Sequence, residues 1–192
     1  WNVPNILSLV RIFMIPLLTA IVYTPFPGRN AWACGVFVLA ALTDFLDGWL
    51  ARRWQLSSAF GAFIDPVADK LMVATALVLL SAKCASAGGY VEIAAALTIA
   101  RELGVSALRE WMAERGVRAA VQVGFMGKCK TAAQMIAISG LLLSLPSPAT
   151  MILGVQTAWV YSISVGLLWL STGLAVVSGG IYLHAAWPSL SK

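Results

Sequence analysis

Long apolar stretches, separated by short breaks, dominate this chain. A membrane-spanning helix needs ~20 mostly apolar residues. Six stretches of that kind can be marked, and they cover residues 6–22, 32–50, 67–81, 90–108, 131–145 and 149–186. The last is 38 residues long, which exceeds one span. It predicts either one long helix with a loop-like start near 151–156 or two short helices.

The breaks between these stretches contain residues that end helices. Segments 24–28, 87–89 and 146–148 are rich in Pro and Gly, which interrupt helical patterns. We therefore predict an all-α polytopic membrane protein with six transmembrane helices and a cytoplasm-facing polar cavity. Residues 1–192 are expected to form a single membrane domain.

The composition excludes a soluble enzyme. Hydrophobic residues make up 60% of the chain and charged residues 11%, whereas soluble domains contain ~25% charged residues. The net charge of +5 is too small, and too interrupted by apolar runs, to indicate a nucleic-acid partner; membrane lipids with anionic headgroups are expected instead. The three cysteines form no CxxC pair, so neither a disulfide framework nor a zinc site is indicated, and buried, inert thiols are expected.

Lysine and arginine are unevenly distributed between the predicted loops. Basic residues concentrate on the cytoplasmic side of membrane proteins. Only Arg29 and Lys83 flank one set of loops, whereas seven basic residues flank the other set. This bias predicts a cytoplasmic N-terminus, and no cleavable signal pattern is expected ahead of the first stretch. The seven residues are Arg52, Arg53, Arg109, Arg115, Arg118, Lys128 and Lys130.

All four aspartates of the chain lie within 26 residues. Ionisable groups inside a spanning stretch cost ~2.5–3.5 kcal/mol each on insertion and usually mark a functional site. Four carboxylates also repel one another, so positive charge is expected among them. The aspartates are Asp44, Asp47, Asp65 and Asp69.

The spacing of the aspartates predicts how they meet. Asp44 and Asp47 are three residues apart, and Asp65 and Asp69 are four apart, so each pair shares one helix face. A turn over 53–58 would reverse the chain between them. Two antiparallel helices would then present two carboxylates each to a common point.

Carboxylates without nearby Cys or His suit hard divalent cations such as Mg²⁺ or Mn²⁺. Two such ions ~3.5–4 Å apart are a recurrent device for displacement at phosphorus, and four aspartates are suitable ligands for two ions. The alternative is that the acids are ordinary charges at a helix end, paired with Arg52, Arg53 and Lys70.

At these residues the sequence resembles the CDP-alcohol phosphotransferase family. The string Asp44-x2-Asp47-Gly48-x2-Ala51-Arg52-x8-Gly61-x3-Asp65-x3-Asp69 is similar to the signature of that family at all eight fixed positions. The resemblance implies a six-span enzyme that moves a phosphatidyl or related group from a CDP-linked donor to an alcohol and releases CMP.

The resemblance also implies the metal ligands. Asp44, Asp47 and Asp65 are expected to bind one Mg²⁺ or Mn²⁺ ion. Asp44, Asp65 and Asp69 are expected to share a second. Asp69 would in addition accept the proton of the acceptor hydroxyl, as a carboxylate within hydrogen-bond reach can do.

The CDP-linked donor is expected near the start of the same site. The resemblance assigns contacts with the CDP moiety to Gly48, Arg52 and Ser58. Asn5 and Arg11 could contact the donor from the start of the first helix. Arg11 could equally extend from that helix to the membrane surface.

Outside the signature, further segments are similar to those members of the family that use glycerol 3-phosphate as acceptor. With the signature, the similarity spans roughly residues 4–135. The segments are 4–11, 101–102, 106–111 and 127–131.

A dianionic acceptor needs fixed positive charge. Arg109, Arg118, Lys128 and Lys130 border the predicted cytoplasmic side and can contact a phosphate. Arg101, eight residues before Arg109, is expected to face the same cavity. The alternative is that these residues only anchor the spans in the membrane.

The resemblance implies CDP-diacylglycerol and sn-glycerol 3-phosphate as substrates, a homodimer, and a place in the bacterial inner membrane with the active site facing the cytoplasm. Within the same chemistry, the acceptor could instead be inositol phosphate, serine, choline or phosphatidylglycerol. From another class, the acids could form a divalent-cation transport path. Transporters commonly contain inverted repeats, and no second half of this chain repeats the acids.

Overall fold

The computed structural model describes residues 3–54, 59–84, 89–115, 125–146 and 154–190, some of them by their backbone alone. Every regular element in these ranges is an α-helix, which confirms the all-α prediction. The helices are α1 (Val3–Tyr23), α2 (Arg29–Trp54), α3 (Ala59–Cys84), α4 (Tyr90–Glu114), α5 (Phe125–Leu143) and α7 (Gly154–Leu190).

The helices end where the Pro/Gly breaks predict. Helix α1 stops at Tyr23 and α2 begins at Arg29, on either side of the first break. Gly28 and Gly89 both have φ of 77°, a left-handed conformation that glycine adopts without steric cost. These two residues allow the chain to turn directly into α2 and α4.

Several helices are longer than the apolar stretches that predicted them. Helix α3 begins at Ala59 rather than at residue 67, α4 continues to Glu114, and α5 begins at Phe125 rather than at residue 131. The stretches were marked by apolar content alone, and the helices continue through charged flanks that lie outside those stretches. This extension places Asp65 within α3 and Lys128 and Lys130 within α5.

The final apolar tract is one helix. Helix α7 runs without interruption over 37 residues from Gly154, so the alternative of two short helices is wrong. Residues 149–153 of that tract lie outside the described part of the chain.

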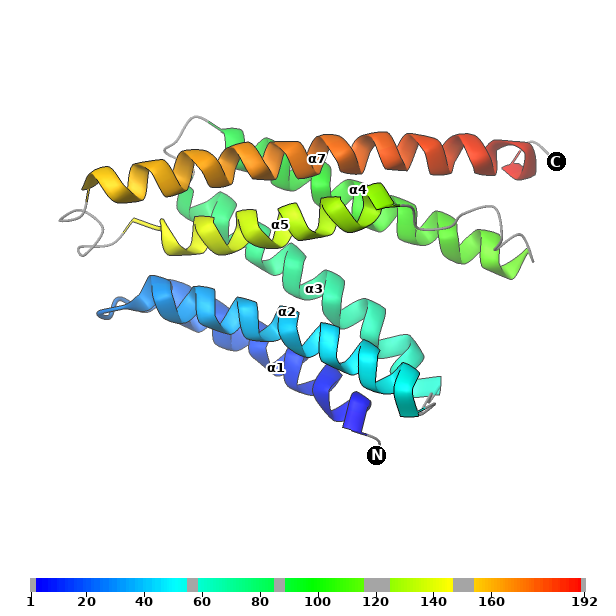
Figure 1. The fold of residues 1–192 in the computed structure, drawn as a ribbon, viewed down its shortest axis with the longest axis horizontal. Coiled ribbons are helices and arrows are strands. Elements are labelled where there is room, and N and C mark those ends of the chain that lie inside the picture. The colour runs from blue at the N-terminus through cyan, green and yellow to red at the C-terminus, as the bar shows by residue number, and fades with distance from the viewer. Residues whose placement is uncertain (1–2, 55–58, 85–88, 116–124, 147–153, 191–192) are drawn as a thin grey trace.

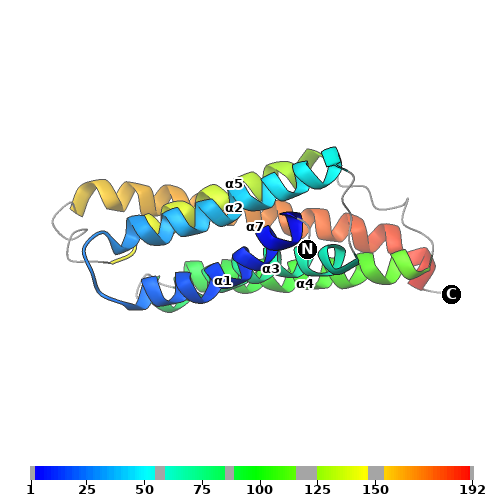
Figure 2. The same cartoon turned by 90° about the horizontal axis from the view of Figure 1, so that it is seen from below.

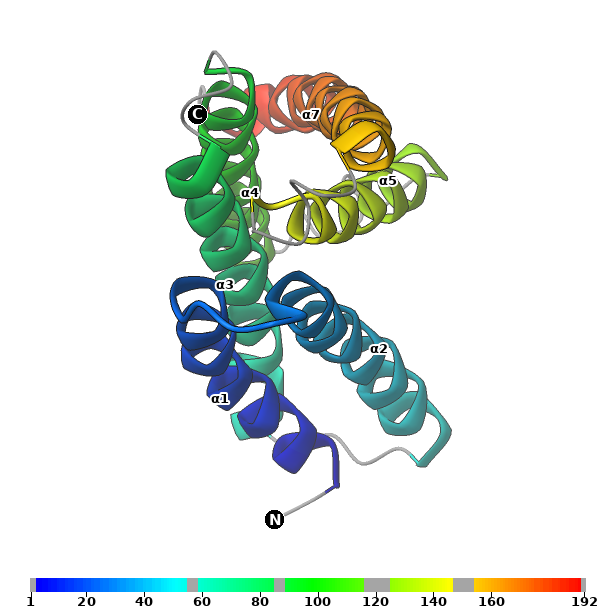
Figure 3. The same ribbon diagram turned by 90° about the vertical axis from the view of Figure 1, so that its left-hand side faces the viewer.

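The six helices pack as a ring, viewed along its length in Figure 3. Going round the ring, α1 packs on α2, α2 on α5, α5 on α7, α7 on α4, α4 on α3, and α3 on α1. The most extensive of these contacts joins α5 and α7. Helix α3 also contacts α2 and α5 across the ring. Residues far apart in sequence therefore face a shared interior.

Successive helices run in opposite directions, as Figures 1 and 2 show. The start of α1, the end of α2, the start of α3, the end of α4 and the start of α5 all lie at the same end of the bundle. The basic residues that flank these helix ends are therefore on one side of the molecule. This arrangement agrees with the loop asymmetry in the sequence.

The bundle has an apolar surface as well as an apolar core. Buried leucines such as Leu18, Leu77 and Leu141 form the core, while Phe13 is 73% exposed and Trp159 69% exposed. Soluble monomers rarely leave apolar patches of more than a few hundred Å² in water. Among the described residues, ten polar or charged side chains, Arg11 and Lys130 among them, are buried instead. Such a distribution is typical of a protein surrounded by lipid.

Two helices are long and apolar enough to cross a membrane by length and composition, within the described residues. They cover Ile6–Tyr23 in α1 and Ala158–His184 in α7. Cys129–Leu143 in α5 is a shorter apolar segment. Of the three cysteines, Cys84 is buried, Cys34 is half-buried and Cys129 is exposed, so the expectation of buried thiols is wrong at Cys129.

Close approach of α5 and α7 depends on Gly140. A Cβ atom at this position would overlap the Ser164 hydroxyl and lie 3.2 Å from the Ser164 Cβ. Gly140→Leu should therefore force the two helices apart and destabilise the fold by about 1–3 kcal/mol, as overpacking does. Thermal unfolding in detergent measures the loss. Gly166→Leu on the exposed face of α7, where an added Cβ meets nothing, is the matched control, and an equal effect of both variants would contradict the prediction.

Candidate active site

The first contact of the site joins α1 to the aspartate motif on α2. The Arg11 Nη1 atom donates a hydrogen bond of 2.7 Å to Oδ1 of Asp44. The arginine side chain is 1% exposed, whereas that of Asp44 is 44% exposed. Arg11 thus lies inside the bundle and holds a carboxylate whose other face is open to ligands. Such charge-assisted hydrogen bonds are about twice as strong as neutral ones.

Asp69 approaches the same place from α3. It lines a small internal cavity together with Arg11, and α2 contributes Phe37, Ala40 and Ala41 to that cavity. Asp69 interacts electrostatically with both Asp44 and Arg11. The structure therefore brings the first and the last aspartate of the motif to a common point, with one arginine between them.

The other motif residues are placed by their backbone. Asp47, Gly48 and Arg52 belong to the last two turns of α2, and Asp65 lies one turn before Asp69 on α3. Asn5 belongs to the first turn of α1. Ser58, a predicted donor contact, lies outside the described residues.

The donor set fits hard divalent cations. Asp44 and Asp69 offer oxygen ligands on neighbouring helices. Asp47 follows Asp44 by three residues in α2, and Asp65 precedes Asp69 by four residues in α3. Residues at these spacings lie on one face of a helix. Among the described side chains, no three Asp, Glu, His or Cys residues gather closely enough to hold an ion. The side chains of Asp47 and Asp65 are outside that set. Oxygen-only donors of this kind suit Mg²⁺ or Mn²⁺.

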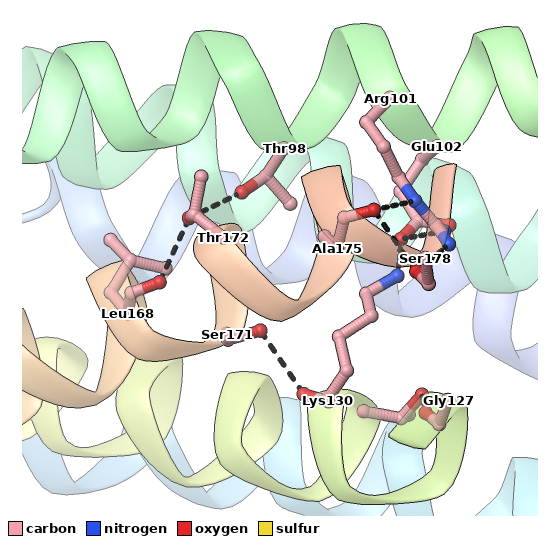
Figure 4. A network of polar contacts seen from close by, with 11 residues as sticks. Thr98, Arg101, Glu102, Gly127, Lys130, Leu168, Ser171, Thr172, Ala175 and Ser178 are labelled. Carbon is pink, nitrogen blue, oxygen red and sulfur yellow. Dashed lines mark hydrogen bonds and ion pairs between the residues drawn. The ribbon is translucent and has the colours of Figure 1, made fainter. Parts of the chain in front are cut away.

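A second polar cluster lies beside the aspartates, on α4, α5 and α7 (Figure 4). Lys130 of α5 forms an ion pair with Oε1 of Glu102 on α4. Arg101 Nη1 lies 3.3 Å from the same Glu102 oxygen. Two residues predicted to bind the acceptor, Arg101 and Lys130, are thereby brought together through a carboxylate.

A cavity of about 220 Å³ connects the two clusters. Asp69 and Lys70 line it from α3, Glu102 and Thr98 from α4, and Thr131 from α5. The rest of its wall is mostly apolar and includes Leu71, Leu77 and Leu103. The polar part of this wall is formed by Asp69, Lys70 and Glu102, so the cavity has the lining that a ligand with both polar and apolar groups requires.

The remaining predicted acceptor residues lie elsewhere or are described only in part. Arg109 is exposed on α4 and lines neither of the cavities that contain Asp69. Arg118 lies outside the described residues, and Lys128 is described by its backbone in α5. The spacing of Arg101 and Arg109 put both on one helix face, but Arg101 points to α7, where its Nε donates to the carbonyl of Ala175.

Glu102 is part of the site, although the sequence analysis gave it no role. The sequence did indicate a role for Glu102, because it is an ionisable residue within a predicted apolar stretch, and such residues usually mark functional sites. Only the tertiary structure shows that Glu102 contacts Lys130 of α5 and lines the cavity that contains Asp69.

The arrangement can perform two tasks side by side. The aspartate cluster, with bound cations, can neutralise a diphosphate and accept a proton from a hydroxyl. The lysine of the second cluster can attract an anionic group of another ligand. The charges that carry out both tasks come from α1, α2, α3, α4 and α5.

Comparisons with known proteins show which family the chain belongs to. The profile of the CDP-alcohol phosphatidyltransferase family matches residues 1–177. The chain is 42% identical over 186 residues to a Salmonella choleraesuis protein named CDP-diacylglycerol–glycerol-3-phosphate 3-phosphatidyltransferase, covering 97% of this chain and 95% of the relative. Proteins of the same name from Sodalis glossinidius and Pectobacterium atrosepticum are 46% and 45% identical, each over 88% of this chain and 90% of the relative. Sequence, fold and site together show that this chain belongs to the CDP-alcohol phosphatidyltransferase family.

Proposed function

We propose that this protein transfers the phosphatidyl group of CDP-diacylglycerol to sn-glycerol 3-phosphate, giving phosphatidylglycerophosphate and CMP. The observation that carries the proposal is the similarity to transferases of that name over 97% of the chain. The juxtaposition of an aspartate cluster and a buried lysine supports it, because the reaction joins a diphosphate donor to a phosphorylated alcohol.

Two Mg²⁺ or Mn²⁺ ions held by Asp44, Asp47, Asp65 and Asp69 would neutralise the phosphoryl oxygens and the CMP leaving group. Arg11 orients Asp44 for this task through its 2.7 Å hydrogen bond, as hydrogen-bonded partners of metal ligands generally do.

Asp69 accepts the proton from the acceptor hydroxyl. The hydroxyl oxygen forms a bond to the β-phosphorus of the donor, and the bond from that phosphorus to the oxygen of CMP breaks. The proton passes to the Asp69 carboxylate, and the electron pair leaves with CMP. Proton transfer by a positioned carboxylate contributes ~10²–10⁴-fold in rate.

The remaining residues bind the two substrates. Gly48, Arg52, Ser58 and Asn5 contact the CDP part of the donor. Lys130 binds the phosphate of the acceptor, and Lys128, Arg109 and Arg118 add positive charge. Arg101 of α4, which is hydrogen-bonded to α7, supports this group.

The six helices cross the bacterial inner membrane, with the N-terminus and the active site on the cytoplasmic side. The apolar outer surface supports this placement, as do Trp32, Trp159 and Trp187, which are exposed as in the aromatic belts of membrane proteins. The protein acts as a homodimer, with each chain containing its own site.

Purified protein in detergent, supplied with labelled CDP-diacylglycerol and Mg²⁺ or Mn²⁺, tests the function. We expect CMP release that requires glycerol 3-phosphate and stops when a chelator removes the ions. The same assay with phosphatidylglycerol, inositol phosphate, serine or no acceptor provides the controls. CMP release that is independent of glycerol 3-phosphate, or faster with another acceptor, would contradict the acceptor assignment.

A further inference from the structure

We propose that Glu102 is a positioning residue that fixes the Lys130 ammonium for the phosphate of the acceptor, with Arg101 and α7 supporting Glu102 from behind. The inference rests on the proposed function. It assigns a role to an acid outside the aspartate motif.

Glu102 joins two cations that belong to different parts of the bundle. Its Oε1 atom forms ion pairs with Lys130 of α5 and with Arg101 of its own helix. The carboxylate is 26% exposed and lines the cavity that contains Asp69. One oxygen of Glu102 therefore determines where the lysine ammonium lies relative to that cavity.

Arg101 is fixed by α7 and so gives Glu102 a rigid support. Arg101 Nε donates to the carbonyl of Ala175 at 2.8 Å, and Nη2 donates to the Ser178 hydroxyl at 2.7 Å. Ser178 in turn donates to the Ala175 carbonyl at 3.0 Å. The Arg101 side chain is only 13% exposed, and its Nε and Nη2 atoms both donate to α7. Its role here is support, whereas Lys130 provides the charge for the ligand.

Lys130 is held both through its backbone and at the tip of its side chain. The residue is 5% exposed, and its backbone carbonyl accepts a hydrogen bond of 3.0 Å from Ser171 on α7. Its ammonium meets Glu102 at the other end (Figure 4). A lysine ammonium has three donors, so the Glu102 contact leaves capacity for a phosphate oxygen.

The position of this lysine suits one particular kind of ligand. Lys130 interacts electrostatically with Asp69 as well as with Glu102, and Glu102 lines the cavity that contains Asp69. An acceptor with a hydroxyl at one end and a phosphate at the other can reach both. Without Glu102, the flexible lysine stem would turn toward Asp69 and the other aspartates, which would remove its charge from the phosphate.

A role in local folding alone would also explain a buried Glu–Lys pair. The folding role and the positioning role predict different effects on the KM values. A positioning role predicts that Glu102→Gln raises the KM for glycerol 3-phosphate about tenfold or more, since hydrogen bonds to charged groups have effects of this size. The KM for CDP-diacylglycerol should change less than about twofold, because the donor binds at the other cluster. Glu110→Gln, an exposed acid on the same helix, is the matched control and should leave both constants unchanged.

A double-mutant cycle tests whether Glu102 acts through Lys130. Lys130→Met should itself raise the acceptor KM, and adding Glu102→Gln to it should have little further effect, because the positioned group is gone. Glu102→Asp, which keeps the charge on a shorter stem, should give an intermediate KM and keeps the test valid if one variant fails to fold. Thermal unfolding of every variant in detergent identifies folding defects.

The outcomes separate this inference from the proposed function. Wild-type protein without glycerol 3-phosphate-dependent CMP release would overturn both. Active wild type with an unchanged acceptor KM in Glu102→Gln, or with both KM values raised equally, would overturn the positioning role alone. Additive effects of Glu102→Gln and Lys130→Met would show that Glu102 does not act through the lysine, and would overturn it as well.

Discussion

Asp69→Asn is expected to lower the rate of CMP release by roughly 10²–10⁴-fold, the range that a general base contributes. The amide of asparagine keeps the shape of the side chain but cannot accept the proton of the acceptor hydroxyl, and it is a poorer ligand for a divalent cation. Binding of labelled CDP-diacylglycerol should persist, because the CDP contacts lie toward the ends of α1, α2 and α3. Single-turnover CMP release and donor binding, measured on the same preparation, check both parts.

The burial of Asp69 among charged groups makes this variant informative. Asp44, Arg11, Glu102 and Lys70 all act electrostatically on Asp69, and Asp69 lines both the cavity that contains Arg11 and the cavity that contains Glu102. Glu110→Gln again serves as the control for loss of a carboxylate. An Asp69→Asn protein that retains more than about a tenth of the wild-type rate would remove Asp69 as the base.

Arg11→Met is expected to weaken the apparent affinity for Mn²⁺ or Mg²⁺ by roughly 10–100-fold, the usual effect of losing a hydrogen-bonded partner of a metal ligand. Arg11 contacts Asp44 from inside the bundle, and methionine fills similar space without the hydrogen bond. The dependence of CMP release on metal concentration measures the change. Arg11→Lys, which keeps the charge but not the planar donor geometry, should lie between the wild type and Arg11→Met.

The same variant distinguishes two roles for Arg11. If Arg11 contacts the CDP-linked donor, Arg11→Met should raise the donor KM and leave the metal dependence unchanged. If Arg11 instead orients Asp44, the metal dependence of CMP release should change more than the donor KM. The depth of Arg11, 1% exposed, favours the second result. Thermal unfolding separates either effect from loss of the fold.

Much of the fold could be predicted from the chain alone because the signals are local. Apolar stretches and Pro/Gly breaks follow from neighbouring residues, and they predicted the six helices of the described chain. The apolar stretches placed the starts of α3 and α5 too late in the chain, because apolar content does not reveal that a helix continues into charged flanks. They also left the final tract undecided between one helix and two, and α7 shows that it is one.

The aspartate motif was equally readable, since a fixed spacing over two helices puts carboxylates on matching faces whatever surrounds them. Sequence by itself thus determined the element order, the family resemblance and the four acids proposed as metal ligands. Arg11 with Asp44, and Glu102 with Lys130, were decided by the tertiary structure. These partners are separated by 33 and 28 residues, and only the packing of the helices brings them together. A pairing of this kind depends on which helix faces pack against each other, and that depends on all six helices at once.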